Sequence, residues 1–133
     1  MTATLEDVLE LLNGEAEVIQ GFEGDEAQAE AESIINYRGK PYCIVRNWTL
    51  VDIDVTDTYR ADLAGDGLEP IVLYASDVLI HSAGKRDRGN WVRSTFQLCF
   101  QMGYLFETQN TCYLLLGPGR RKRAHVQTVM AIF

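Results

Sequence analysis

Apolar residues at the start of the chain recur at helical spacing. The members of this series are Leu5, Val8, Leu9 and Leu12. Thr4 precedes them as a helix cap, with an acidic residue three positions on, and Gly14 follows as a stop signal. The pattern predicts a helix over residues 4–13. A second, solvated helix is predicted over residues 25–33, where helix-forming residues follow an acidic start.

From residue 34 onward the spacing becomes strand-like, because apolar and polar residues alternate between turn signals. The strands predicted from this alternation are 34–37, 42–45, 49–55, 71–74 and 78–80. Residues 91–116 carry the clearest pattern, which predicts a three-stranded antiparallel meander. The tail, residues 124–133, returns to helical spacing and is predicted to form a short closing helix.

Together these elements predict a single α+β domain over residues 1–133. Within it, residues 1–33 form an acidic helical segment, and residues 34–133 form mainly strands with a C-terminal cap. The expected sheet is antiparallel, with about five to seven strands, an N-terminal helix pair and a short C-terminal helix. A chain of 133 residues with 47% hydrophobic residues is large and apolar enough for one core.

Charge is unevenly distributed along the chain. Residues 1–32 contain ten Asp or Glu and no Lys or Arg, whereas residues 85–133 contain eight Lys or Arg and two Asp or Glu. The formal net charge of −7 argues against non-specific binding to DNA or to anionic membranes. No run of about 18 apolar residues predicts a membrane span. A start without a basic, apolar leader and three cysteines without paired spacing predict a cytoplasmic protein.

A glycine-rich turn followed by four basic residues is the sharpest motif. Its members are Gly117, Pro118, Gly119, Arg120, Arg121, Lys122 and Arg123. Glycines leave backbone N–H groups free to turn toward an anion, so the motif is an anion-binding candidate for a phosphate or a nucleic-acid backbone. It lacks the Gly-Lys-Ser/Thr ending of a P-loop. The plainer and favoured interpretation is a strand-ending turn with a solvated basic face, paired to the acidic part of the chain.

Carboxylates in the first third of the chain form a second candidate surface. Those assigned to it are Glu23, Asp25, Glu26, Glu30 and Glu32. Acidic side chains without countercharges can attract a basic partner, and such a surface can mimic a nucleic-acid backbone in a cationic groove. The segment therefore predicts contact with a partner protein whose identity the sequence does not give.

Residues suited to catalysis or metal binding are few. The thiols and imidazoles of the chain are Cys43, Cys99, Cys112, His81 and His125. The cysteines lie in apolar strand patterns, where they act as small hydrophobes, and no spacing joins them to a histidine or forms a zinc motif. Asp52 and Asp54 share one strand face and could hold Mg²⁺, although a wet strand face is the commoner explanation. We therefore expect no catalytic residue, metal or cofactor, and favour a non-enzymatic role.

Aromatic residues offer a further alternative. Trp48, Trp91, Tyr104 and Tyr113 could stack on nucleic-acid bases, although packing in a core or across strands is the commoner use of such residues.

Four segments carry a resemblance to a known family. They are residues 36–42, 91–95, 105–111 and 115–122, which begin Asn-Tyr-Arg-Gly, Trp-Val-Arg, Leu-Phe-Glu-Thr and Leu-Leu-Gly-Pro. The chain resembles small uncharacterised proteins, each a domain of unknown function, from bacteria and their phages. The resemblance implies no activity, but it makes phage or mobile-element biology a reasonable setting.

These observations lead to one preferred function and one alternative. The preferred function is an interaction protein, such as a phage or mobile-element accessory factor, that uses its acidic surface against a basic partner. The alternative is a nucleic-acid or phosphate-ligand binder that uses the Gly117–Arg123 basic loop. An enzyme is the least favoured class, because no acid–base constellation can be assembled from the spacings.

Overall fold

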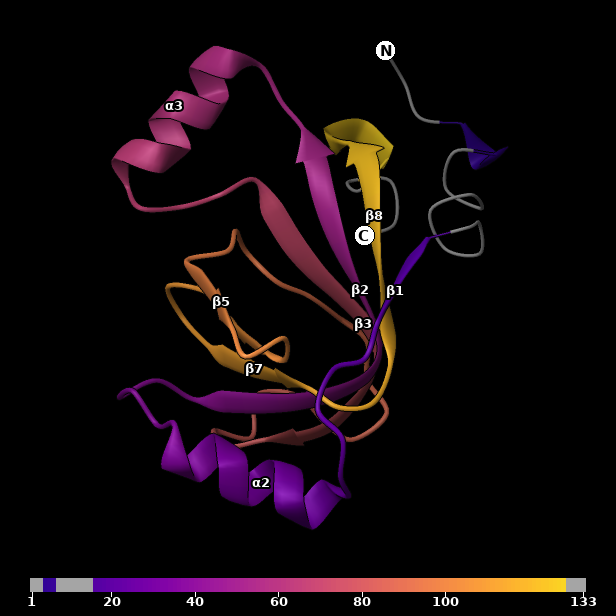
Figure 1. The fold of residues 1–133 in the computed structure, drawn as a ribbon, viewed down its shortest axis with the longest axis vertical. Coiled ribbons are helices and arrows are strands. Elements are labelled where there is room, and N and C mark those ends of the chain that lie inside the picture. Colours follow the sequence, from indigo (N-terminus) through magenta and orange to yellow (C-terminus); the bar gives the residue numbers. More distant parts are fainter. Residues whose placement is uncertain (1–3, 7–15, 129–133) are drawn as a thin grey trace.

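The computed structural model describes residues 4–6 and 16–128. Eight strands form one curled sheet, with α2 beneath it and α3 at its upper end (Figure 1). The elements, in chain order, are β1 (Glu17–Ile19), α2 (Glu26–Ile35), β2 (Tyr42–Asp54), α3 (Asp57–Gly65), β3 (Ile71–His81), β4 (Val92–Arg93), β5 (Cys99–Gln101), β6 (Leu105–Glu107), β7 (Cys112–Leu115) and β8 (Gly119–His125). Within the described residues, neither helix is long and apolar enough to cross a membrane.

The long strand β2 organises the sheet. Along one edge it pairs antiparallel with β3, whose far edge holds β4. Along the other edge its first half pairs with β7 and its second half with β8, and both of these pairings are parallel. The ladder with β3 is irregular between Ile44 and Val45, and Asn47 has a left-handed backbone with φ of 54°. Such irregularities bend a strand, which fits the curl of the sheet at the point where β7 gives way to β8 (Figure 1).

The concave side of the sheet encloses the main core. Val45, Trp48 and Leu50 of β2 pack with Leu73 of β3 and Phe106 of β6, and all five are buried. Burial of each such side chain stabilises the fold by about 1.5–3 kcal/mol. This core therefore joins strands that are distant in the sequence.

Helix α2 packs on the sheet through a narrow face of small residues. Asp25 begins the helix with a capping box, in which its carboxylate accepts from the N–H of Gln28 at 2.8 Å. Ala29 and Ser33, one turn apart, are the buried positions of the helix, and Ser33 Oγ donates to the Ala29 carbonyl. Because these side chains are small, α2 lies close to the sheet and leaves its other faces to solvent.

The predicted antiparallel sheet of five to seven strands, with a helix pair before it, is wrong. The sheet has eight strands and is mixed, since β2 runs parallel to both β7 and β8. Parallel partners lie far apart in sequence and are joined by no turn, so local alternation does not reveal them. Several predicted strands also merge, since residues 42–45 and 49–55 fall in the single strand β2, and residues 71–74 and 78–80 fall in β3.

Some elements match their prediction and others do not. The predicted second helix is confirmed as α2, although it extends through the predicted strand at residues 34–37 as far as Ile35. The meander is confirmed, because β5, β6 and β7 pair antiparallel in sequence order. Helix α3 was not predicted, and only Leu63 of its nine residues is buried, so it carries little apolar periodicity. Most of the predicted first helix lies outside the described residues.

At the C-terminal end, strand β8 takes the first two residues of the predicted closing helix. Residues 124 and 125 belong to β8, and helical geometry covers residues 126–128. The rest of the predicted closing helix lies outside the described residues.

Candidate functional site

Gly117 and Gly119 of the basic motif allow the turn before β8 to pack against Trp48. Gly117 has φ of +73°, and its N–H donates to the carbonyl of Phe22 at 2.9 Å. Its own carbonyl accepts from Trp48 Nε1 at 3.1 Å. A Cβ on Gly119 would lie 2.2 Å from the Trp48 ring, so only glycine fits there. These glycines bring β8 against the core.

The basic residues that follow lie in a strand and alternate between its two faces. On one face, Arg121 Nε and Nη2 each donate to an oxygen of Asp52 at 2.8 Å, a bidentate pair. Arg123 pairs with Asp54 at 3.2 Å. The pKa of Arg121 is raised, mainly by its hydrogen bonds to Asp52. The predicted anion site over Gly117–Arg123 therefore stays a prediction, with two of its cations already paired to aspartates.

The other two cations of the motif face the opposite side of β8. Lys122 is buried, and Arg120 Nη2 donates to Thr49 Oγ1 at 3.4 Å. Arg120 also lines an open groove, described below. The motif is therefore neither a loop nor a uniform basic patch.

The predicted acidic residues lie on α2 and the segment before it. Glu23 is exposed, Asp25 caps the helix, and Glu26 pairs with Arg88. Glu30 accepts a hydrogen bond from the Tyr42 hydroxyl at 3.2 Å, and Glu32 accepts from the Tyr104 hydroxyl at 3.2 Å. The structure thus gathers these carboxylates on α2 and its N-terminal approach, and anchors several of them.

Neutral donors hold Glu30 and Glu32 in place. Burial, followed by the hydrogen bond from its hydroxyl to Glu30, raises the pKa of Tyr42. Burial, followed by the charge of Glu32, raises the pKa of Tyr104. Both phenols therefore stay protonated at neutral pH and donate. Because a phenol carries no charge, these contacts orient the carboxylates without cancelling their negative charge.

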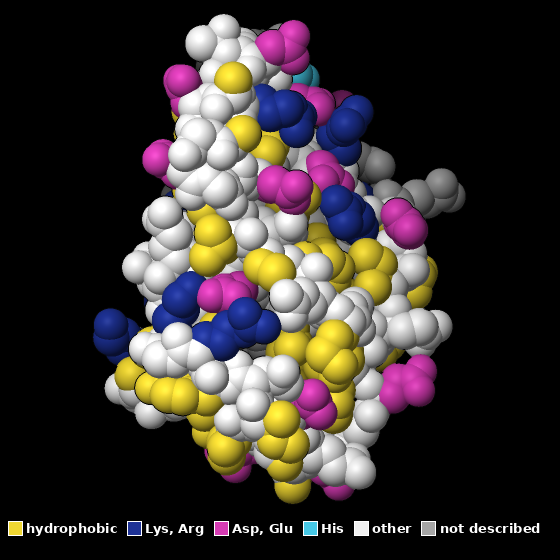
Figure 2. All heavy atoms as spheres, turned by 60° about the vertical axis from the view of Figure 1, so that its left-hand side comes forward, with side chains coloured by type: hydrophobic (Ala, Val, Ile, Leu, Met, Phe, Trp, Pro, Cys, Tyr) yellow, Lys and Arg dark blue, Asp and Glu magenta, His cyan; other side chains and the backbone are white. Residues whose placement is uncertain are grey.

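Large apolar side chains are exposed at the C-terminal end of α2. Ile34, Ile35 and Tyr37 are 58%, 78% and 62% exposed, and Met102, in the turn between β5 and β6, is 65% exposed. Tyr104 connects the two places, because its hydroxyl lies 3.7 Å from the Met102 sulfur and also donates to Glu32. Figure 2 shows hydrophobic side chains gathered over the lower part of the molecule, where α2 lies, with acidic side chains among them.

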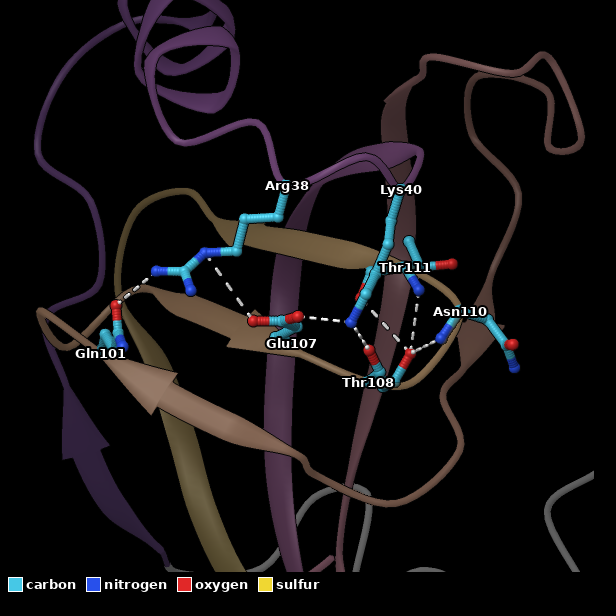
Figure 3. Close-up of polar contacts among 7 residues, drawn as sticks. All are labelled: Arg38, Lys40, Gln101, Glu107, Thr108, Asn110 and Thr111. Carbon is cyan, nitrogen blue, oxygen red and sulfur yellow. Dashed lines mark hydrogen bonds and ion pairs between the residues drawn. The ribbon is translucent and has the colours of Figure 1, made fainter. Parts of the chain in front are cut away.

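An ionic cluster that sequence reasoning missed holds the segment after α2 (Figure 3). The Glu107 side chain, 14% exposed, pairs with Lys40 and lies 3.8 Å from Arg38 Nε. Lys40 Nζ also donates to the Thr108 carbonyl at 2.9 Å, and Arg38 Nη2 donates to Gln101 at 3.1 Å. Two cations flank one carboxylate, so the cluster carries an excess positive charge. Its signal in the sequence was the presence of these residues in two of the segments that carry the resemblance.

This cluster fixes the chain and does not enclose a ligand. Thr108 Oγ1 accepts from the N–H groups of Asn110 and Thr111 at 3.2 and 3.1 Å and shapes the turn before β7 (Figure 3). The cavity beside Arg38 and Glu107 measures about 20 Å³, which is room for about one water molecule. The cluster therefore positions Tyr37 and the end of α2 against the β5–β6 turn.

The Cys43 and Cys112 thiols are poorly suited to nucleophilic catalysis. Cys43 and His81 are cross-strand partners, a proximity that sequence spacing did not indicate. Burial, however, raises the pKa of the Cys43 thiol to about 12. Burial and the charge of Glu107 raise the pKa of Cys112, and burial, followed by the charges of Arg86 and Lys85, lowers that of His81. These thiols stay protonated at neutral pH, so they are weak nucleophiles.

Other candidates from the sequence have structural partners. Asp52 and Asp54, considered as Mg²⁺ ligands, are paired with Arg121 and Arg123. In residues 4–6 and 16–128, no group of three or more His, Cys, Asp or Glu side chains is arranged to hold a metal ion. Trp48 and Tyr113 are core residues, as the plainer interpretation predicted, whereas Trp91 is 51% exposed.

Comparison with known proteins gives a family but no function. No curated protein and no solved structure matches the chain. A family model described as a domain of unknown function (DUF6957) matches residues 20–131, which include every described helix and strand from α2 to β8. The chain therefore belongs to this family of domains of unknown function.

Proposed function

We propose that this protein is a non-enzymatic interaction module, which binds a basic partner protein through the acidic and apolar surface around α2. The single observation that carries the proposal is the exposure of Ile34, Ile35, Tyr37 and Met102 beside carboxylates held by neutral donors. Exposed apolar clusters of this kind mark contact surfaces for other proteins.

Charge complementarity identifies the class of partner. Glu30 and Glu32 keep their negative charge in fixed positions, and Glu23 and Asp25 extend the acidic surface at the start of α2. A partner that presents apolar side chains among Lys or Arg would bury the isoleucines and pair with the carboxylates. Opposite charges at the rim would speed its association. The resemblance to proteins of bacteria and their phages supports a role as a phage or mobile-element accessory factor in the cytoplasm.

The test is reconstitution of a binary complex. A protein captured from bacterial lysate on the full chain would be purified, and its affinity would be measured by calorimetry at low and high salt. We expect Ile34→Ser combined with Ile35→Ser, and separately Glu30→Gln combined with Glu32→Gln, to raise Kd at least tenfold. The amide variants keep the hydrogen-bond acceptors and remove only the charge.

Matched substitutions on α3 supply the control. Asp62→Asn combined with Asp66→Asn removes two exposed carboxylates from α3 and its C-cap and should leave Kd unchanged. A complex that responds equally to the α3 and α2 amide variants would overturn the proposal. So would a complex whose affinity is independent of salt, or the absence of any reconstituted complex.

A further inference from the structure

One row of side chains crosses five neighbouring strands on a single sheet face. In register, Val18 of β1 faces Arg120 of β8, and Arg120 faces Thr49 of β2. Thr49 in turn faces Tyr74 of β3, and Tyr74 faces Arg93 of β4. Residues in register point to the same side of a sheet, so these five side chains form a continuous row. Arg93 is therefore the neighbour of Tyr74 on this face, and Arg120 lies two strands away, beyond Thr49.

An open groove runs along this row. Its volume is about 580 Å³, and its lining includes Asn47, Thr49, Tyr74, Ser76 and Arg120. That volume lies within the range of about 300–1,000 Å³ typical of ligand sites. Asn47 is exposed and has φ of 54°, so its polar side chain lies at a bend of β2 beside the groove. The residues named here are neutral or cationic, which makes the groove locally unlike the acidic chain as a whole.

Aromatic rings stand beside the groove. Trp91 precedes β4, and its ring centroid lies 6.5 Å from that of Tyr74, with 32° between the ring planes. Its side chain is 51% exposed, whereas Trp48 is 1% exposed. From the usual strand spacing, Arg93 and Arg120 are separated by about 14 Å across the sheet. The face thus combines two guanidinium groups with an exposed ring and polar side chains.

We propose that this face binds single-stranded nucleic acid. Bases stack on aromatic rings with little sequence preference, and arginines contact the phosphates between them. An isolated phosphate would not need the rings, and a duplex would not offer its bases for stacking. The proposal keeps Arg120 of the predicted anion motif and replaces its other cations by Arg93 on a different strand. It is independent of the partner surface at α2, which lies on another element.

Fluorescence anisotropy with labelled 12-nucleotide strands tests the proposal. The probes are an oligo-uridine, an oligo-thymidine, a duplex of equal length and an abasic strand of the same charge. We expect the two single strands to bind at least tenfold more tightly than the duplex and the abasic strand. The abasic comparison isolates stacking without altering the protein.

Substitutions then locate the site. Trp91→Ala should raise Kd for oligo-uridine about tenfold, since base stacking contributes at this level. Arg93→Gln combined with Arg120→Gln should weaken binding and reduce the salt slope by about 0.7 for each phosphate that the variant no longer neutralises. The matched controls are Tyr59→Ala for an exposed ring and Arg60→Gln for an exposed cation, and neither should change Kd. Circular dichroism and thermal unfolding would verify that each variant is folded.

Several outcomes would overturn the inference. These are equal affinity for the abasic strand, displacement by ATP as effective as displacement by oligo-uridine, and unchanged binding by a folded Trp91→Ala variant. An absence of binding by any strand at low salt would do the same. Because Ile34→Ser combined with Ile35→Ser tests the α2 surface and Trp91→Ala tests the groove, failure of one proposal is distinguishable from failure of the other.

Discussion

The acidic helix and the basic strand are both dense in charge, but the fold treats their charges in opposite ways. On β8, Arg121 and Arg123 meet aspartates of the parallel strand β2. On α2, Glu30 and Glu32 meet phenols. An ion pair cancels charge, whereas a phenol fixes a carboxylate and leaves its charge intact. A run of like charge in a sequence therefore does not measure surface charge, because the contacting groups decide what remains.

The comparison depends first on β8 being held against β2, and the largest effect should come from that contact. Trp48→Ala removes a buried ring and is expected to lower the free energy of unfolding by about 3–5 kcal/mol. Gly119→Ala places a Cβ 2.2 Å from the same ring and is expected to cost about 1–3 kcal/mol. Urea unfolding monitored by circular dichroism measures both. Gly65→Ala, where the added Cβ would contact no other part of the fold, is the control and should be neutral or stabilising.

Alkaline pH should lower the stability of the folded protein. Burial raises the pKa of Cys43 from 9.0, and that of Tyr113 from 10.0, to about 12 in each case. Between about pH 9 and 12 the unfolded chain releases protons that the folded protein retains, so stability is expected to fall as pH rises. Each pKa unit of difference contributes about 1.4 kcal/mol. Urea midpoints measured across this range would contradict the prediction if they stayed constant.

The order of local loosening at high pH provides a finer test. Tyr42 and Tyr104 also have raised pKa values, and their phenolate forms would repel Glu30 and Glu32. The guanidinium of Arg121 stays charged throughout. The contacts that Tyr42 and Tyr104 make with α2 should therefore weaken as these phenols ionise, whereas β8 stays paired to β2. Tyrosine absorbance follows the ionisation, and circular dichroism follows the loss of helix. In the variant that combines Tyr42→Phe with Tyr104→Phe, no phenolate can form at these positions, so the loosening of α2 should depend less on pH.

A double-mutant cycle compares the two arginine pairs. Asp52 and Arg121 are both partly buried and joined by two hydrogen bonds, so their coupling is expected at about 1–2 kcal/mol. Asp54 and Arg123 are more exposed, so their coupling is expected below about 0.5 kcal/mol. The cycles use Asp→Asn and Arg→Gln, with unfolding free energies as the measurement. Equal couplings would contradict the expectation that the less exposed, bidentate pair is the stronger one.

The smallest effect is expected at the acidic surface itself. Glu30→Gln combined with Glu32→Gln keeps the acceptors for both phenols, so the free energy of unfolding should change by less than about 0.5 kcal/mol. A large loss of stability would mean that the carboxylate charges hold the fold together. That outcome would remove the contrast between α2 and β8, and thermal unfolding is sufficient to detect it.

Local pattern predicted the elements with strong short-range signals. Asp25 and the residues after it carry a cap and good helix formers, and α2 forms where they predict it. The meander β5–β6–β7 follows from alternation and short turns. Ile34 and Ile35 were predicted to begin a strand, yet the helix continues through them and exposes them. Their exposure is a tertiary fact with no local signal.

The pairing of strands could not be predicted from the same signals. Thr49 and Arg120 are partners across a parallel ladder, and no turn links their strands. The groove on that face draws residues from β2, β3 and β8, with Arg93 of β4 beside it, so it exists only after the sheet has formed. The same holds for Lys40 and Glu107, which meet because β6 lies beside the segment after α2.

By itself, the sequence determined where apolar periodicity is strong, where α2 begins, and how charge is divided along the chain, because these depend on neighbouring residues. Only the tertiary structure decided which charges at the surface are not paired with an opposite charge and which aromatic rings are exposed. Those outcomes depend on partners brought together across strands, as when Asp52 meets Arg121 and Tyr74 comes between Arg93 and Thr49. Energies of contact between distant residues select such arrangements, and local spacing does not encode them.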